Sequence, residues 1–391
     1  PDMADVASAV APAETAIQHD RLGTGDAVKA AREIVDGFEG TVLVLYGDTP
    51  LTEADTLRRM IAAREAGAAV VVLGFRPDDP GAYGRLVGEA DGTLHRIVEA
   101  KDATPDELAN NLCNSGVMAI DGRHLFALLD RVEANNAKGE YYLTDIVGLA
   151  TGDGLPARIV EGTPDEALGV NSRAELAEAE AILQDRMRAR AMSDGATLVD
   201  PGTVWFSHDT RLGRDVVVHP NVVFGPGVTV ADGVEIKAFS HFEGAHVGAG
   251  AIIGPYARLR PGAEIGADAH IGNFVEVKNA TVGKGAKANH LTYIGDADIG
   301  AGSNIGAGTI TCNYDGFDKH RTAIGEGAFI GSNSSLVAPV TIGAGAIVGA
   351  GSTVSGAVEE DALVVERAER FDKPGWAKEF RQRKQDRKRA G

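Results

Sequence analysis

The stretch that decides the fold is residues 247–278, VGAGAIIGPYARLRPGAEIGADAHIGNFVEVK. An aliphatic residue, often followed by glycine, recurs in it every six positions, at Val247, Ile253, Leu259, Ile265, Ile271 and Val277. A period of six fits neither an α-helix nor the two-residue alternation of a hairpin strand. It is typical of a solenoid whose short strands turn a corner every six residues, with the aliphatic side chains stacked inside. We therefore predict a parallel β-helix.

The same period continues on both sides of this stretch. Its other members are Leu212, Val218, Phe224, Val230, Ile236, Phe242, Ile294, Ile299, Ile305, Thr311, Ile324, Ile330, Leu336, Ile342, Val348 and Val354. At about eighteen residues per three-sided coil, this length predicts roughly eight coils. Between Thr311 and Ile324, about seven extra residues break the register. Solenoids extrude such insertions as loops, commonly on the binding face.

The segment before the solenoid has a different pattern. Residues 1–171 contain the β-branched runs TVLVLY at 41–46 and AVVVLG at 69–74, each after a stretch with helical spacing. Alternation of this kind predicts an α/β domain with a mostly parallel sheet.

Three further segments complete the predicted organisation. Residues 172–195 carry apolar residues at three- and four-residue steps and predict a linker helix, which Asn171 and Ser172 are suited to cap. Residues 196–368 form the predicted β-helix. Residues 369–391 are rich in Lys and Arg, and we interpret them as a solvated basic tail.

Charge and cysteine content narrow the class of protein. The formal net charge of −18 argues against a nucleic-acid partner, because neutralising nucleic-acid phosphates requires a broad basic face. Cys113 and Cys312 form no disulfide or metal-ligand pattern, which favours a reducing compartment. The sequence shows no signal peptide and no run of about 18 apolar residues, so we expect a cytoplasmic protein without a membrane span.

Four blocks of the β-helix region carry a family resemblance: RLRPG at 258–262, NFVEVK at 273–278, NHLTY at 289–293 and NIGAGTITCNY at 304–314. With these blocks, the chain resembles the bacterial bifunctional N-acetylglucosamine-1-phosphate uridylyltransferase/glucosamine-1-phosphate N-acetyltransferase family. The resemblance implies a left-handed β-helix, a threefold homotrimer and acetyl-transfer sites shared between neighbouring subunits. It also implies acetyl transfer from acetyl-CoA to the amine of glucosamine 1-phosphate, giving N-acetylglucosamine 1-phosphate.

Residue chemistry agrees with this activity. Acetyl transfer to an amine needs a base that takes a proton from nitrogen, and neutral imidazole is suited to this near pH 7. His290 matches the family position of that base. Arg260 and Lys278 lie eighteen residues apart, which predicts two cations stacked on one face for an anionic ligand such as a sugar phosphate. Because no residue offers a covalent acyl acceptor, we expect direct attack in a ternary complex.

The resemblance also assigns binding residues by position. The substrate contacts that it implies are Arg260, Lys278, Tyr293 and Asn304. The acetyl-CoA contacts that it implies are Ala307, Asn313, Tyr314, Ser332, Ala350 and Arg367, with Asn313 also matching a sugar contact.

Residues 1–171 resemble the family's uridylyltransferase domain, a Rossmann-like nucleotidyltransferase. That domain makes UDP-N-acetylglucosamine, a peptidoglycan and lipopolysaccharide precursor, and pyrophosphate from UTP and N-acetylglucosamine 1-phosphate. The nucleotide-sugar contacts implied are Gln18, Gly23, Thr24, Tyr46, Gly47, Asp48, Gly84, Glu99, Asn114 and Asn171. Asp48 and Asn171 are the implied Mg²⁺ ligands. The family's preceding Gly-rich loop and lysine do not occur in this sequence, so we expect a truncated domain and little uridylyl transfer.

Two other functions stay open at this point. A β-helix zinc enzyme of carbonic-anhydrase type would use histidines on neighbouring coils, for which the candidates are His241, His246, His270 and His290. A non-enzymatic β-helix scaffold would show regular outward Thr or Ser ladders. Three further histidines are interpreted as solvated surface residues: His208, His219 and His320.

Overall fold

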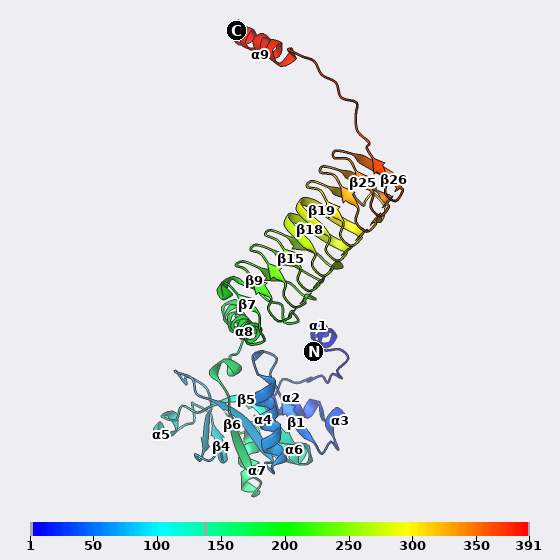
Figure 1. The fold of residues 1–391 in the computed structure, drawn as a ribbon. Helices are drawn as coiled ribbons and strands as arrows, with labels where there is room; N and C mark the ends of the chain where they lie inside the picture. The colour runs from blue at the N-terminus through cyan, green and yellow to red at the C-terminus, as the bar shows by residue number, and fades with distance from the viewer. Residues whose placement is uncertain (1–2, 137–138, 390–391) are drawn as a thin grey trace. The chain divides into compact units, whose positions relative to one another are not determined.

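The computed structural model describes residues 3–136 and 139–389 (Figure 1). The chain forms two compact units, residues 1–183 and 184–391. The division falls inside the long helix α8 (Arg173–Ser193), between Leu183 and Gln184. The domains predicted from the sequence also include residues 1, 2, 137, 138, 390 and 391, which lie outside the described residues.

The first unit is built on a six-stranded sheet with the order β4-β3-β5-β2-β6, in which β1 also pairs with β5. The strands are β1 (Thr41–Val44), β2 (Val70–Phe75), β3 (Arg85–Gly88), β4 (Leu94–Val98), β5 (Cys113–Asp121) and β6 (Ala157–Glu161). The prediction of a mostly parallel sheet is wrong. The central strand β5 runs antiparallel to β1, β2 and β3, and within the described ranges only β2 and β6 pair in parallel. Because β1, β2 and β6 still share one direction, their carboxyl ends face the same edge, where β5 begins.

Helices cover both faces of this sheet. They are α2 (Thr24–Ala30), α3 (Arg32–Val35), α4 (Ala54–Glu65), α5 (Pro105–Leu108), α6 (Gly122–Leu129), α7 (Asp145–Gly152) and the 3₁₀ helix η1 (Pro164–Ala167). The first helix of the chain, α1 (Ala4–Ala9), buries no residue. Alternate residues of β2 point to opposite faces. Val70 and Val72 share a core with α6 and α7, whereas Val71 and Leu73 share one with Met60 of α4.

Helix α8 begins with the predicted cap. Ser172 Oγ accepts a hydrogen bond from Glu175 N at 3.2 Å, and Glu175 Oε2 accepts one from Asn171 N at 2.7 Å. Two backbone N–H groups at the start of the helix, which have no partner within it, are thereby hydrogen-bonded. In the second half of the helix, the buried Gln184 side chain accepts from Phe206 N and donates to Phe206 O. Within the second unit, this pair joins α8 to the first coil.

The second unit is a parallel β-solenoid of about nine coils, so the predicted β-helix is confirmed. Its elements are β7 (Thr197–Leu198), η2 (Pro201–Thr203), β8 (Arg211–Leu212), β9 (Val217–Val218), β10 (Val223–Phe224), β11 (Thr229–Val230), β12 (Glu235–Ile236), β13 (His241–Phe242), β14 (Ala245–Val247), β15 (Ile252–Ile253), β16 (Arg258–Leu259), β17 (Ala263–Ile265), β18 (His270–Val282), β19 (Lys287–Ile299), β20 (Asn304–Ile305), β21 (Ile310–Cys312), β22 (Thr322–Ile324), β23 (Phe329–Ile330), β24 (Ser335–Ile342), β25 (Ile347–Val348), β26 (Thr353–Val358) and β27 (Leu363–Val364). The first coil starts at Thr197, before the six-residue period becomes regular.

The six-residue period forms the core of the solenoid. Phe224, Phe242, Leu259 and Val277 pair in turn on successive coils and are fully buried. The rings of Phe206, Phe224 and Phe242 stack with centroids 5.2 Å apart. Close stacking of identical positions explains why the sequence period is so regular.

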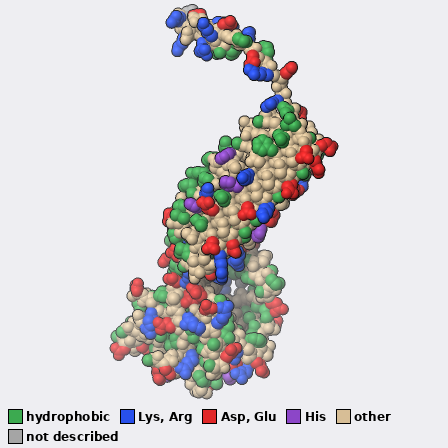
Figure 2. Space-filling view, in the orientation of Figure 1, with side chains coloured by type: hydrophobic (Ala, Val, Ile, Leu, Met, Phe, Trp, Pro, Cys, Tyr) green, Lys and Arg blue, Asp and Glu red, His purple; other side chains and the backbone are tan. Residues whose placement is uncertain are grey.

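Two segments leave the solenoid. The predicted insertion emerges between β21 and β22. The basic tail forms a helix, α9 (Trp376–Arg389), and is exposed over its described length. Figure 2 shows Lys and Arg side chains gathered along that helix. In the ranges described, no helix combines the length and the apolar character that a membrane crossing requires.

Candidate functional sites

His290 stands in one column with most of the residues expected to bind acetyl-CoA. An interior ladder on successive coils runs through Ala288, Ile305, Ile330 and Val348. Each member of this ladder is followed, two residues later in the chain, by a member of the column: His290, Ala307, Ser332 and Ala350. Arg367 extends the column, since its Nη1 donates to Ala350 O at 2.8 Å. With coils about 4.8 Å apart, the column spans about 19 Å.

His290 is held by its neighbour on the preceding coil. Asn273 and His290 are partners in the β18–β19 ladder, and His290 Nδ1 lies 2.6 Å from Asn273 Oδ1. An amide oxygen only accepts, so this contact places the proton on Nδ1 and leaves the Nε2 lone pair free. The imidazole is exposed. It therefore has the tautomer and the access that a general base requires.

Cations gather on the next face of the coils. Arg260 follows β16 and Lys278 lies in β18, which pairs with β16. The side chain of Lys319, from the inserted loop, makes a hydrogen-bond contact with that of Lys278. This contact, followed by the charges of Lys319 and Arg260, lowers the pKa of Lys278. Arg260 Nη1 donates to Glu276 Oε1 at 2.7 Å, which raises the pKa of Arg260. Like charges held this close make a site for an anion.

The sequence analysis missed Lys319. The residue lies in the insertion, where the six-residue period gives no positional information. The available signal was a lysine six residues after Asn313, inside a loop already expected on the binding face.

Polar side chains converge over Gly295, beside these cations. A Cβ on Gly295 would lie 2.3 Å from Tyr293 Oη and 2.8 Å from Asn313 Nδ2. The buried carboxylate of Asp296 accepts hydrogen bonds from Asn279 and Asn313. Burial raises the pKa of Asp296, but these two hydrogen bonds and the nearby lysines outweigh burial, so its pKa is lowered. Asp296 thus stays ionised and fixes the Asn313 amide.

The structure of one chain does not bring all the expected residues into one pocket. His290 precedes the corner at Leu291, where φ is 51°, whereas Tyr293 follows that corner on the next face. Asn304 lies in another column, between Lys287 and Phe329, and among the described residues no hydrogen bond or ion pair joins it to the cations. Tyr314 is 60% exposed on the inserted loop.

The first unit holds the second set of expected residues. Gln18 Nε2 donates to Asp26 Oδ2 at 2.7 Å and to Gly23 O at 3.1 Å. Gly23 has a φ of 114°, and a Cβ there would lie 2.7 Å from Tyr141 O, so this position requires glycine. The segment before α2 is thereby held in a single conformation.

Four expected residues meet where β1 ends. Burial raises the pKa of Tyr46, the carboxylates of Asp48 and Glu99 raise it further, and a hydrogen bond with Thr24 lowers it. Tyr46, Gly47 and Thr24 also line a cavity of about 450 Å³ beside β1. Residues from α2, the segment after β1 and the loop after β4 therefore lie together.

Gly84 and Asn114 adjoin the same region. Asn114 N donates to Gly84 O at 2.8 Å. A Cβ on Gly84 would lie 3.7 Å from Glu99 Oε1, so a bare backbone faces that carboxylate. Nine of the ten expected nucleotide-sugar residues are thus accounted for by contacts in this region or at its border.

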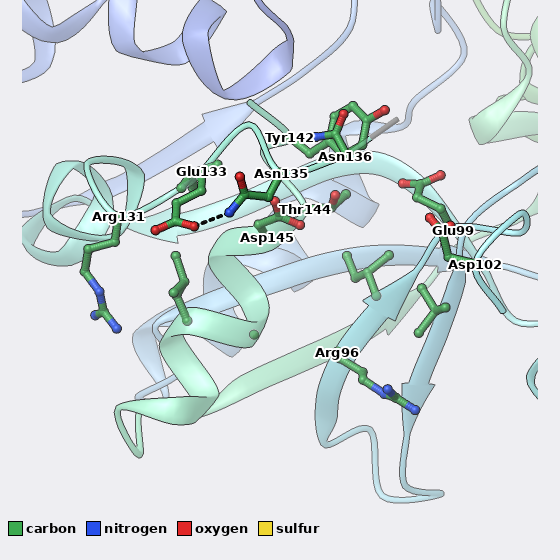
Figure 3. A pocket seen from close by; sticks show the side chains of 15 residues that line it. Arg96, Glu99, Asp102, Arg131, Glu133, Asn135, Asn136, Tyr142, Thr144 and Asp145 are labelled. Carbon is green, nitrogen blue, oxygen red and sulfur yellow. Dashed lines mark hydrogen bonds between the residues drawn. The ribbon is translucent and has the colours of Figure 1, made fainter. Parts of the chain in front are cut away.

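A pocket of about 660 Å³ opens beside Glu99 (Figure 3). Tyr142, Thr144 and Asp145 line it, at the start of α7. Burial raises the pKa of Asp145, and the Glu99 carboxylate adds to this effect. The sequence analysis did not identify these three residues, and their signal was a polar and aromatic run directly before a helix.

Asn171, the tenth residue, directly follows a residue that is hydrogen-bonded to Asp48. Val170 N donates to Asp48 O at 2.7 Å. A carboxylate and an amide oxygen at one sheet edge fit Mg²⁺, which prefers oxygen ligands and few protein groups when a substrate supplies phosphates. Among residues 3–136 and 139–389, no three His, Cys, Asp or Glu side chains group as metal ligands, including the histidines of the zinc alternative.

Comparison with known proteins matches one family model and several solved structures. The family of bacterial transferase hexapeptide repeats (six repeats) matches residues 209–244, 244–279 and 321–356. A solved UDP-N-acetylglucosamine acyltransferase, LpxA from Bacteroides fragilis, aligns with a TM-score of 0.36 and 19% identity over 42% of this chain and 69% of that one.

Curated relatives align over nearly the whole chain. The bifunctional protein GlmU of Paramagnetospirillum magneticum is 62% identical over 97% of this chain and 85% of its own length. The GlmU proteins of Rhodospirillum rubrum and Zymomonas mobilis are 63% and 54% identical, over 97% and 95% of this chain and 86% and 83% of theirs. Identity at this level over this length shows that the chain belongs to the GlmU family of bifunctional enzymes.

Proposed function

We propose that the β-helix transfers the acetyl group of acetyl-CoA to the amine of glucosamine 1-phosphate. The observation that carries this proposal is the column from His290, with its free Nε2, to Arg367. An extended coenzyme laid along it would have its thioester near His290 and its phosphates near the guanidinium. Membership of the GlmU family supports the same activity.

In the proposed step, the substrate amine attacks the thioester carbonyl carbon. His290 Nε2 takes a proton from the attacking nitrogen, the C–S bond breaks, and the departing thiolate takes up a proton. The products are N-acetylglucosamine 1-phosphate and coenzyme A. Asn273 acts as a positioning residue, because its carbonyl fixes the imidazole tautomer.

The cations Arg260, Lys278 and Lys319 would bind the substrate phosphate. A dianion between Lys278 and Lys319 relieves their mutual repulsion. Asn313 and Tyr293, which meet over Gly295, would contact the sugar.

We further propose that the acetyl-transfer site is shared between copies in a homotrimer. His290 and the cations lie on different faces of the solenoid, and we infer that a second copy brings them together. Supporting this, the corner at Leu291 belongs to an exposed apolar ladder with Phe239, Tyr256 and Phe274, whose rings stack at 4.9 and 5.1 Å. All four residues have positive φ, a conformation that costs bulky side chains about 1–3 kcal/mol. We name this set the corner ladder.

The first unit is proposed to keep the nucleotide-sugar and Mg²⁺ binding residues of a uridylyltransferase. Asp48 and Asn171 would hold Mg²⁺, which supplies charge neutralisation for the phosphates of UTP. Thr24, Tyr46 and Glu99 would bind the nucleotide sugar at the end of β1. The expectation of little uridylyl transfer stays a prediction, which pyrophosphate release from UTP and N-acetylglucosamine 1-phosphate would decide.

One experiment tests the acetyl-transfer proposal. The protein is incubated with acetyl-CoA and a panel of amino sugars, with and without a 1-phosphate, and free thiol is followed. We expect thiol release with glucosamine 1-phosphate and much less with glucosamine. No thiol release with any sugar would remove the proposal and favour a scaffold, while stoichiometric zinc in the purified protein would favour the zinc alternative.

A further inference from the structure

The inserted loop is a short, closed hairpin. His320 N donates to Asn313 O at 2.9 Å, and Tyr314 and Lys319 form an antiparallel bridge. Asp315 N donates to Asp318 O at 3.2 Å across the turn. The loop therefore has a defined backbone from residue 313 to residue 320.

Asp315 is the centre of this hairpin. Its Oδ1 accepts from Phe317 N and from Asp318 N, both at 2.8 Å, and its Oδ2 lies 2.8 Å from His320 Nε2. The hydrogen bond from Asp318 N, followed by those from His320 and Phe317, lowers the pKa of Asp315 to about 2. The carboxylate is thus ionised at all ordinary pH values and accepts from three donors at once.

Lys319, the residue before His320, lies close to two other positive charges that repel it. Lys319 stands against Lys278, with Arg260 close by, and like charges repel in the absence of an anion. A lysine on a loose loop would turn into solvent, because its side chain loses rotamer freedom when it is held. Something in the hairpin must fix the backbone at residue 319.

We propose that the Asp315–His320 pair is a positioning device that holds the hairpin so that Lys319 stays beside Lys278 at the phosphate site. The proposal rests on the proposed acetyl transfer to a sugar phosphate. His320 does not touch the substrate and acts through Lys319. The pair joins residues on opposite sides of the turn, so it closes the hairpin where Lys319 leaves it.

The energetic scale of the pair sets the expected effect. The Asp315 and His320 side chains are 49% and 34% exposed, and a contact this exposed between a carboxylate and an imidazole contributes at most about 1 kcal/mol. A loss of this size corresponds to about a fivefold change in binding. The coils depend mainly on their neighbours, so loosening the loop leaves the solenoid folded.

The first test is steady-state kinetics of His320→Ala in the full chain. We expect KM for glucosamine 1-phosphate to rise about fivefold while kcat changes less than about twofold. His320→Gln, whose amide can still donate to Asp315, should recover most of the loss. His208→Ala, an exposed histidine outside the loop, is the matched control and should leave both constants unchanged. An unchanged KM in His320→Ala, or a Gln variant as weak as the Ala variant, would overturn the proposal.

The second test is a double-mutant cycle with Lys319→Ala. If His320 acts through Lys319, then His320→Ala should add almost nothing in the Lys319→Ala background. Fully additive effects would show that His320 acts by another route and would contradict the positioning role. If Lys319→Ala alone leaves the preference for the phosphorylated sugar intact, the proposed phosphate site itself is wrong, which is a distinct result.

Discussion

At the scale of single residues, the proposed chemistry depends most on His290. Replacing it by alanine removes the free Nε2, and loss of a general base costs about a hundredfold or more in rate. We expect His290→Ala to lower kcat for thiol release by at least about that factor. The variant should keep its oligomeric state, because the side chain is exposed and its only side-chain hydrogen bond in the described structure goes to Asn273. Thiol release near the wild-type rate would remove His290 from the mechanism.

Gly295 offers a second residue-scale test. The atoms that a Cβ would displace are the ends of the Tyr293 and Asn313 side chains, so the backbone can keep its course. We expect Gly295→Ala to raise KM for glucosamine 1-phosphate about tenfold and to lower the free energy of unfolding by about 1–3 kcal/mol. Gly202→Ala is a suitable control, since the added methyl group meets only Asp200 Oδ1 at 3.9 Å. Unchanged kinetics in Gly295→Ala would place the sugar elsewhere.

At the scale of elements, the structure could be predicted where the sequence repeats a pattern, and much less where it does not. The solenoid was predictable because every coil buries the same position against the next, which imposes the six-residue period. The directions of the strands in the first unit could not be predicted. A strand buried on both faces, such as β2, has the same hydrophobic pattern whether its partner is parallel or antiparallel. Predicting the column through His290 and Arg367 requires the register between strands, which the structure supplies. Lys319 could not be placed because it lies in the insertion, where the six-residue period is interrupted.

The corner ladder offers a test of the proposed trimer. A charge at its third rung would be buried against another copy, and a buried unpaired charge costs several kcal/mol. We expect Phe274→Glu to convert trimers to monomers in sedimentation equilibrium and to abolish acetyl transfer. Phe371→Glu, which changes an exposed aromatic residue of the tail, is the control and should sediment as the wild type does. A fully trimeric, active Phe274→Glu protein would move the subunit interface to another face.

At the scale of the whole molecule, the two units have separate cores. The core of the solenoid draws its residues from position 187 onward, whereas the two main cores around the sheet end at Val160. Among residues 3–136 and 139–389, these cores share no residue. Stability in a solenoid also passes mainly between adjacent coils. Each unit should therefore unfold as its own cooperative block, and the ligand of one should stabilise that block alone.

Scanning calorimetry of the full chain tests this division together with both proposed sites. A ligand at 100 times its Kd stabilises its unit by about 2.7 kcal/mol, which raises the Tm of a unit of this size by about 5–10 °C. We expect UDP-N-acetylglucosamine with Mg²⁺ to shift one transition and acetyl-CoA to shift the other. Asp48→Asn should abolish the first shift only, and Arg367→Ala should reduce the second only, because each side chain belongs to one unit. A single transition that moves with either ligand would show that the two units unfold together, and a nucleotide-sugar shift that survives in Asp48→Asn would place the magnesium ligand elsewhere.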